Sequence, residues 1–349
     1  MAYSTIDKSA DFYNTSVQWG GNDSTQTISG IGFQPALTWV KAINDTTPWG
    51  SLDAVRGSTK WLRQNDSTAE ETKTDGITSF NSDGFAIGAN GYLNDSNYNY
   101  RSWNWKAGTT SGISGGTITP SGYSINTTSK FGIYKYTGNG TAGATIAHGL
   151  GATPSLVIVK RLTNTYDWAV QTPYNHATDP NEYILRLNTT NAGTQDDAFN
   201  NTLASSTVVT LGASTYTNAT SADQEYVMYA WAPVTGYSAF GRYKGNGNAA
   251  GPYIYTGFKP AFILVKRYDS GSINWILADN KREGYNPDND PLYPDVTVAE
   301  GTADNINICS TGFKIINSGD DYNNDGGYYI YAAFGQSIVG SNGVTATAR

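Results

Sequence analysis

The chain has 349 residues, among them 39 glycines, 25 tyrosines and 9 tryptophans, and only 15% of its residues are charged. The net charge of −7 comes without any Lys/Arg cluster, which argues against nucleic acid partners, because neutralising phosphates takes clustered cations. No stretch approaches the roughly 18 consecutive apolar residues of a membrane-spanning helix, so we expect no membrane insertion. The length suffices for two or three domains, each with its own core.

Aromatic and β-branched residues alternate with Gly, Asn, Asp and Ser along most of the chain. This composition predicts an all-β protein of short strands and many turns. Residues 1–8 lack a basic cluster followed by an apolar run, so we expect no signal peptide and synthesis in a host cytoplasm. The single cysteine, Cys309, lies in an alternating strand pattern; we interpret it as a small core residue, with a nucleophile as the alternative.

One pattern occurs three times: GFQPALTWVK at residues 32–41, GATPSLVIVK at 151–160 and GFKPAFILVK at 257–266. Its proline cannot donate to a strand ladder, so it marks the start of a buried strand, called the proline strand below. The three marker prolines are Pro35, Pro154 and Pro260. Three copies indicate a repeated architecture rather than one large sheet.

Three further blocks recur around each proline strand. An opening strand leads into a Gly-Asn turn, a tryptophan strand carries one Trp, and a closing strand ends each copy in aromatic residues. The tryptophans are Trp49, Trp168 and Trp275, and the closing aromatics are Trp105, Trp231 and Phe334. From marker proline to closing aromatic the separations are 70, 77 and 74 residues, as expected when loops vary and strands do not.

We therefore predict three tandem antiparallel β-sandwich units, at residues 1–120, 121–237 and 238–349. The first ends in a Gly/Ser/Thr-rich linker, residues 108–116, which we expect to be too polar to pack. The second junction, residues 233–237, is short, so we expect units 2 and 3 to be held rigidly.

The opening AYSTIDK with DFYNT, the run GIGFQP with WVK, LDAVRG, TSFNSDGF and WNWKAG resemble a known family. It is the family of β-rich repeat domains in virion structural proteins of tailed bacteriophages, notably marine ones, which are often called tail fibre proteins. The resemblance is dense over residues 1–108 and thinner beyond. It implies a jelly-roll, concanavalin- or laminin-G-like sandwich and a place in the virion, and it brings no catalytic residues. The second copy departs most, since residues 171–174 stand where the first copy has Asp53 and Arg56.

Residues 321–326 match the start of a calcium loop, with Asp321, Asn323 and Asp325 at the ligand positions. The twelfth position, which needs a bidentate Glu, is Ala332. We interpret the segment as a hairpin loop and keep a weak calcium site as the alternative; no other cofactor is expected.

Flat amphipathic rings suit carbohydrate, and six loop tyrosines are the candidates for exposed binding residues. They are Tyr92, Tyr98, Tyr174, Tyr285, Tyr293 and Tyr322. Asp53 recurs as Asp279 after the tryptophan strand, each with an arginine three residues on. A structural ion pair is the plainer interpretation; a glycosidase would instead need two carboxylates facing each other across a cleft.

The sequence thus predicts a non-enzymatic virion protein, most simply a tail fibre or appendage adhesin. Its partners would be other virion proteins and a glycan or protein receptor on the host surface, with a homotrimer consistent with a fibre. Two alternatives stay open: a capsid decoration or head-fibre protein, and a carbohydrate-active depolymerase.

Overall fold

The computed structural model describes residues 9–220, 224–282, 286 and 290–335. Throughout these residues the chain is built of strands, joined by turns and short loops. The paired strands of every described sheet run antiparallel. The fold class predicted from composition, all-β, is therefore confirmed. Of the described helices, none is long and apolar enough to cross a membrane.

The same four-stranded arrangement occurs once in each predicted unit, in the order opening, closing, proline and tryptophan strand. In unit 1 these strands are β1 (Tyr13–Gly20), β9 (Asn99–Trp105), β3 (Leu37–Ala42) and β4 (Gly50–Asp53). In unit 2 they are β11 (Phe131–Thr137), β18 (Glu225–Trp231), β13 (Leu156–Arg161) and β14 (Ala169–Gln171). In unit 3 they are β19 (Ser238–Lys244), β25 (Tyr328–Gly335), β21 (Pro260–Arg267) and β22 (Ile276–Asp279).

Each unit also carries a smaller sheet. These are β2 (Gln26–Ser29), β8 (Gly84–Ile87) and β7 (Ile77–Asn81) in unit 1, β12 (Ala144–Ala147) and β17 (Val208–Leu211) in unit 2, and β20 (Tyr253–Tyr255), β24 (Gly312–Ile315) and β23 (Ile306–Cys309) in unit 3. The apolar residues of both sheets form one separate core in each unit.

Shorter elements complete the units. They are η1 (Ser9–Asp11), β5 (Lys60–Trp61), β6 (Glu71–Thr72) and α1 (Gly91–Asn94) in unit 1, and β10 (Gly122–Asn126), β15 (Tyr183–Arg186) and β16 (Thr194–Gln195) in unit 2. The three strands of unit 2 extend its main sheet at both ends.

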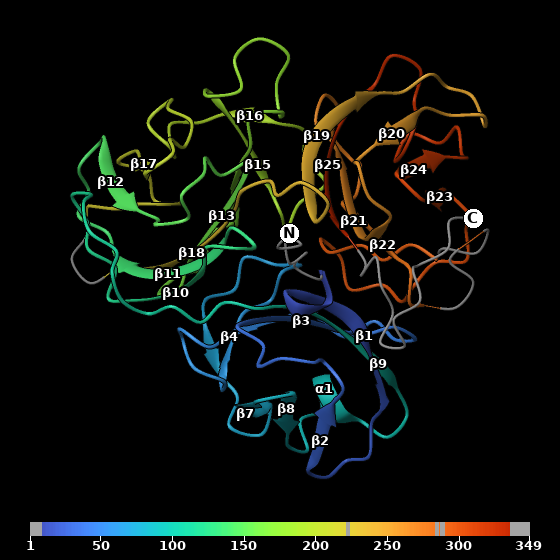
Figure 1. Cartoon of the computed structure of the whole chain (residues 1–349), viewed down its shortest axis with the longest axis horizontal. Helices are drawn as coiled ribbons and strands as arrows, with labels where there is room; N and C mark the ends of the chain where they lie inside the picture. Colours follow the sequence, from blue (N-terminus) through green and yellow to red (C-terminus); the bar gives the residue numbers. More distant parts are fainter. Residues whose placement is uncertain (1–8, 221–223, 283–285, 287–289, 336–349) are drawn as a thin grey trace, which may run out of the picture.

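A further core lies where the three lobes meet (Figure 1). The closing aromatics of all three units are buried there: the rings of Trp105 and Trp231 are 6.1 Å apart and those of Trp105 and Phe334 are 5.6 Å apart. Tyr13 stacks on Phe334 at 5.4 Å. Aromatic side chains bury more area than any others, so this shared centre ties the units together.

The three repeated tryptophans connect the units in cyclic order. Each buries its ring at the boundary of its own unit and donates its indole N–H to a backbone carbonyl of another unit. The bonds are Trp49 to Tyr293 at 2.9 Å, Trp168 to Arg63 at 3.0 Å and Trp275 to Arg186 at 2.8 Å. The hydrogen bonds thus run from unit 1 to unit 3, from unit 3 to unit 2 and from unit 2 to unit 1. Together they close a ring of three units.

The segment predicted to be too polar to pack is paired with unit 2. Thr109 and Ile125 exchange two backbone hydrogen bonds of 2.9 Å, and Ile118, two residues beyond the segment, donates its N–H to the Thr145 carbonyl. Ile113 packs against the core of unit 2. Strand pairing uses backbone groups that every non-proline residue carries, so polar side chains did not prevent it. The unit boundaries at 120 and 237 stay a prediction.

Candidate functional site

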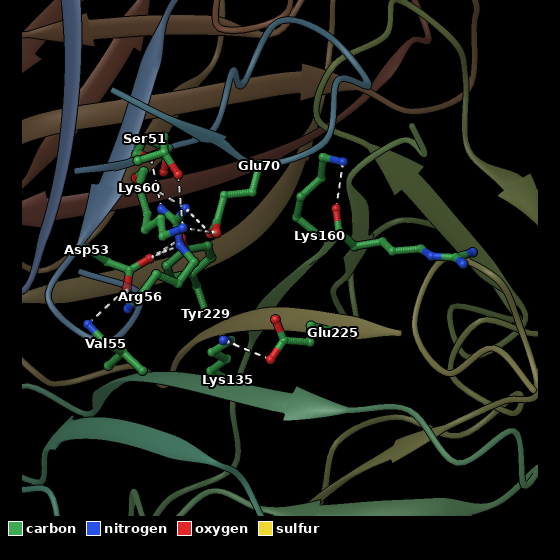
Figure 2. Close-up of polar contacts among 12 residues, drawn as sticks. Ser51, Asp53, Val55, Arg56, Lys60, Glu70, Lys135, Lys160, Glu225 and Tyr229 are labelled. Carbon is green, nitrogen blue, oxygen red and sulfur yellow. Dashed lines mark hydrogen bonds and ion pairs between the residues drawn. The ribbon is translucent and has the colours of Figure 1, made fainter. Parts of the chain in front are cut away.

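A buried polar cluster lies between units 1 and 2 and is centred on Asp53, at the end of β4. Its Oδ1 accepts the backbone N–H groups of Val55 (3.0 Å) and Arg56 (2.8 Å). Its Oδ2 accepts Arg56 Nε at 2.5 Å and the hydroxyl of Tyr229, from β18 of unit 2, at 2.7 Å. Figure 2 shows Tyr229 and Arg56 converging on the carboxylate. Four donors thus occupy the two oxygens of a carboxylate that has no solvent exposure.

Each side-chain nitrogen of Arg56 is also occupied by a hydrogen-bond acceptor. Arg56 Nη1 donates to Glu70 Oε2 at 3.1 Å, and Nη2 donates to the Ser51 carbonyl at 2.9 Å. Burial acts to lower the pKa of Arg56, but the charges of Asp53 and Glu70 outweigh it and hold the pKa above its usual value. Burial also raises the pKa of Tyr229 far above its usual value, so the phenol stays a neutral donor.

A second copy of the cluster lies between units 3 and 1. Asp279 accepts Arg282 Nε at 2.8 Å and the indole N–H of Trp103, from β9 of unit 1, at 3.2 Å. Arg282 also pairs with Glu300 at 2.9 Å. Burial alone would raise the pKa of Asp279, but the charges of Arg282 and Arg101 keep it below its usual value. The carboxylate is therefore held ionised by its structural partners.

The third boundary, between units 2 and 3, has neither the acid–arginine pair nor the ring donor that faces it at the other two boundaries. Thr172 takes the position of Asp53 and Asn175 that of Arg56. In the facing strand, β25, the position of Tyr229 and Trp103 is Ala332, which has no donor. Acid and donor are thus lost together. Because the two replacements lie in different units, they match a contact that depends on both units.

The segment that resembles a calcium loop is instead a clamp on the opening turn. Asn323 has no solvent exposure; its Oδ1 accepts Asn246 N–H at 2.8 Å, and its Nδ2 donates to Asn246 Oδ1 (2.9 Å) and to the Asn248 carbonyl (2.7 Å). Asn94 and Asn218 make the corresponding contacts with the opening turns of units 1 and 2.

The ligand role of Asn323 that the calcium alternative required is therefore wrong, because its amide is already committed to the turn. Burial and the neighbouring Asp320 raise the pKa of Asp321. Asp325 lies beside Gly247 of the same turn. Among the described residues, no group of three or more acidic, His or Cys side chains could hold a metal ion.

The six candidate tyrosines do not form one surface. Tyr322 is only 4% exposed and its hydroxyl accepts the Asn305 amide at 3.0 Å, so its predicted exposure is wrong: it packs in the core of unit 3. Tyr92 is half-buried, with Arg63 and Lys73 over its ring at 5.7 and 5.6 Å. Tyr98, Tyr174 and Tyr293 are half-buried against the cores, and Tyr285 lies outside the described residues.

Sequence reasoning missed the most exposed aromatics. Tyr253 and Tyr255, on β20, are 47% and 69% exposed, and with Val298 they are the exposed large hydrophobic residues of the described part of the chain. Their signal was available: a Tyr-Ile-Tyr alternation between Pro252 and Gly257 predicts two rings on one outward face.

An open groove of about 350 Å³ lies where unit 1 meets unit 2. It is lined by Ala54, Val55, Thr110, Pro120, Ser121, Gly122, Tyr123 and Ser124. None of these side chains is a carboxylate, an imidazole or a thiol, so the groove brings hydroxyl and apolar groups together without an acid–base pair.

These features define an all-β protein whose three similar units share one aromatic core and are joined by buried hydrogen bonds. The chain belongs to the family described as Domain of unknown function (DUF7483), whose match covers residues 8–337 and therefore all three units. No curated protein and no solved structure matches the chain.

Proposed function

We propose that this chain is a non-enzymatic structural protein of a tailed-phage virion, acting as a fibre- or appendage-type adhesin. The single observation that carries the non-catalytic part is the engagement of the buried carboxylates. Asp53 and Asp279, the acids that recur in the repeat, have their oxygens occupied by donors from two units. A general acid or base has to reach a substrate proton, and these carboxylates face protein donors instead.

The virion assignment is supported by the sequence resemblance of residues 1–108 to phage virion proteins. The closed ring of three units is consistent with the virion assignment, because a rigid scaffold can present variable binding loops without a conformational change. Copies displayed on a symmetric particle, including a homotrimer, would add weak contacts into avidity. The partners would then be other virion proteins and a receptor on the host surface.

For each unit we also propose a jelly-roll, concanavalin-like sandwich. The support is that a main sheet and a smaller sheet enclose one apolar core in every unit. This arrangement would put the proline strands in the interior and leave the turns between blocks to vary.

Labelling purified particles with an antibody against this chain tests the virion assignment. We expect the chain to co-purify with the particles and the label to lie on the tail or its appendages. Label on the head alone would support the decoration alternative, and particles without the chain would contradict the proposal.

The depolymerase alternative has its own test. Purified chain is incubated with capsular polysaccharide of the host, and we expect no release of oligosaccharides. Release that is abolished by Asp53→Asn or Asp279→Asn in a folded variant would overturn the non-enzymatic assignment.

A further inference from the structure

The edge strand β20 of unit 3, at the upper right in Figure 1, carries two exposed rings. Tyr253 and Tyr255 are 47% and 69% exposed, whereas Ile254 between them is 6% exposed and packs in the core of unit 3. Residues two apart in a strand lie on one face, about 7 Å apart along the chain. The two tyrosines therefore form a pair of neighbouring rings on the outer face, called the tyrosine platform below.

The fold does not require aromatic residues at these positions. The corresponding strands, β2 and β12, follow the opening strands of units 1 and 2 and also direct one isoleucine, Ile28 or Ile146, into the core. Where unit 3 has its two tyrosines, unit 1 has Thr27 and Ser29, and unit 2 has Thr145 and Ala147. The three copies thus share the buried isoleucine. Only unit 3 has tyrosines at the two flanking positions, where unit 2 has a half-buried threonine and a buried alanine, and this difference points to a role of unit 3 alone.

A hydrogen bond orients Tyr253, and both rings are left uncovered. The hydroxyls of Tyr253 and Thr311 are hydrogen-bonded at 2.7 Å. On the neighbouring strand, Gly312 lies opposite Tyr255, and a Cβ there would come within 3.0 Å of the Tyr253 hydroxyl and 2.0 Å of the Ile254 carbonyl. Position 312 therefore has no room for a side chain, and residue 312 covers neither ring.

Polar groups flank the rings. Lys314 lies opposite Tyr253, and its ammonium donates to the Gly251 carbonyl at 3.1 Å. Asn307 of β23 lies opposite Lys314, on the same face of the sheet. The surface thus combines two aromatic faces with hydroxyl, amide and ammonium groups at their edges.

We propose that the tyrosine platform binds a carbohydrate chain, with two sugar rings against Tyr253 and Tyr255 and sugar hydroxyls toward Thr311, Asn307 and Lys314. A sugar ring has apolar C–H faces and a rim of hydroxyls, which is complementary to a flat amphipathic ring flanked by polar groups. This assignment rests on the proposed adhesive function and names the receptor class of that function.

The dimensions of the surface favour a glycan over a protein partner. Two tyrosine rings offer a few hundred Å² at most, whereas a stable protein interface buries about 800 Å² per partner. Pairing of another strand with β20 is also disfavoured, since the strand has three residues, Pro252 before it has no N–H, and Gly257 beyond it has a φ of +85°.

Binding is measured by saturation-transfer NMR and calorimetry on the whole chain. The probes are cellohexaose, N-acetylchitohexaose and a hexauronate, which separate neutral from acidic glycans. We expect binding of at least one probe in the millimolar range or tighter, and a loss of roughly five- to tenfold in affinity for Tyr255→Ala. Tyr255→Phe keeps the ring and should retain most of the affinity. The matched control, Thr27→Ala in unit 1, should change nothing.

Absence of binding to every probe at about 10 mM would overturn the proposal, as would binding that survives the double change Tyr253→Ala with Tyr255→Ala. If instead a protein binds the chain and still binds after the double change, the free edge of β20 would be assigned to pairing with a strand of that protein. The assay uses purified chain, so its failure leaves the virion labelling result intact, and a chain that binds glycan yet is missing from particles would contradict only the virion assignment.

Discussion

Asp53 and Asp279 illustrate how residues of one unit depend on the next. Each carboxylate lies between an arginine of its own unit and a ring donor of another, Tyr229 or Trp103. Taking two such charges out of water is costly, and the cost is offset only while every donor is present. These residues should therefore matter for the stability of the folded chain.

Asp53→Asn should lower the free energy of unfolding by about 3 kcal/mol, because it leaves the buried charge of Arg56 without its main partner. Chemical denaturation of the whole chain measures this. The control is Asp269→Asn, which removes a partly exposed partner of Arg267 and should cost less than about 1 kcal/mol. Equal effects of the two changes would contradict the interpretation of the Asp53 cluster.

Asn323 provides a second residue-scale prediction. Its replacement by Ala breaks three hydrogen bonds at a fully buried site, so the free energy of unfolding should fall by about 2 kcal/mol. Asn94→Ala and Asn218→Ala should cost similar amounts, since they clamp the equivalent turns. The unfolding transition of the unaltered chain should not move when calcium is added or chelated; stabilisation by calcium that is lost in Asp321→Asn would restore the metal-site interpretation.

At the scale of elements, the last residue but one of each proline strand is a buried lysine: Lys41, Lys160 and Lys266. Their ammonium groups donate to backbone carbonyls, among them those of Ala42 and Arg161 at 2.8 Å. Burial is the main cause that lowers the pKa of all three lysines, from 10.5 to about 8. The folded chain thus releases these protons at a lower pH than the unfolded chain does.

This difference predicts a rise of stability with pH. Between the folded pKa near 8 and the unfolded value of 10.5, the unfolded chain binds more protons, so the free energy of unfolding increases as pH rises through that window. Denaturation at about pH 7.5 and 9.5 should show a gain on the order of 1 kcal/mol per lysine. Buried tyrosines, whose pKa values burial raises, oppose this gain only above about pH 10. Replacing the three lysines by Met should flatten the profile, and an unchanged slope would contradict this account.

Much of the local structure could be predicted from the sequence, since strand starts, turns and repeats follow from residue type. Pro35 and its counterparts identified the proline strands for this reason. Contacts between units leave no such pattern: Trp49 and Tyr293 are 244 positions apart. The calcium site was only a weak alternative to a turn at residues 321–326, because Asp and Asn also favour turns. Comparison of the three copies argues against it, since Asn94, Asn218 and Asn323 recur while Asp321 is replaced by Tyr92 and Tyr216.

At the scale of the whole molecule, the three units form one closed ring. Every unit has its own core, but the closing aromatics share a fourth, and each repeated tryptophan donates to a carbonyl of another unit. A ring has no free end, so loosening one boundary weakens the other two. Such a body suits a scaffold that must hold its loops in fixed positions.

Differential scanning calorimetry of the unaltered chain and of Trp275→Phe tests whether the ring of three units is closed. The change keeps an aromatic ring and removes the hydrogen bond to the Arg186 carbonyl. If the ring is closed, the unaltered chain unfolds in one transition whose calorimetric and van 't Hoff enthalpies agree, and the variant unfolds in one transition shifted to lower temperature. Two or three separate transitions, or a variant in which only one of them moves, would contradict it.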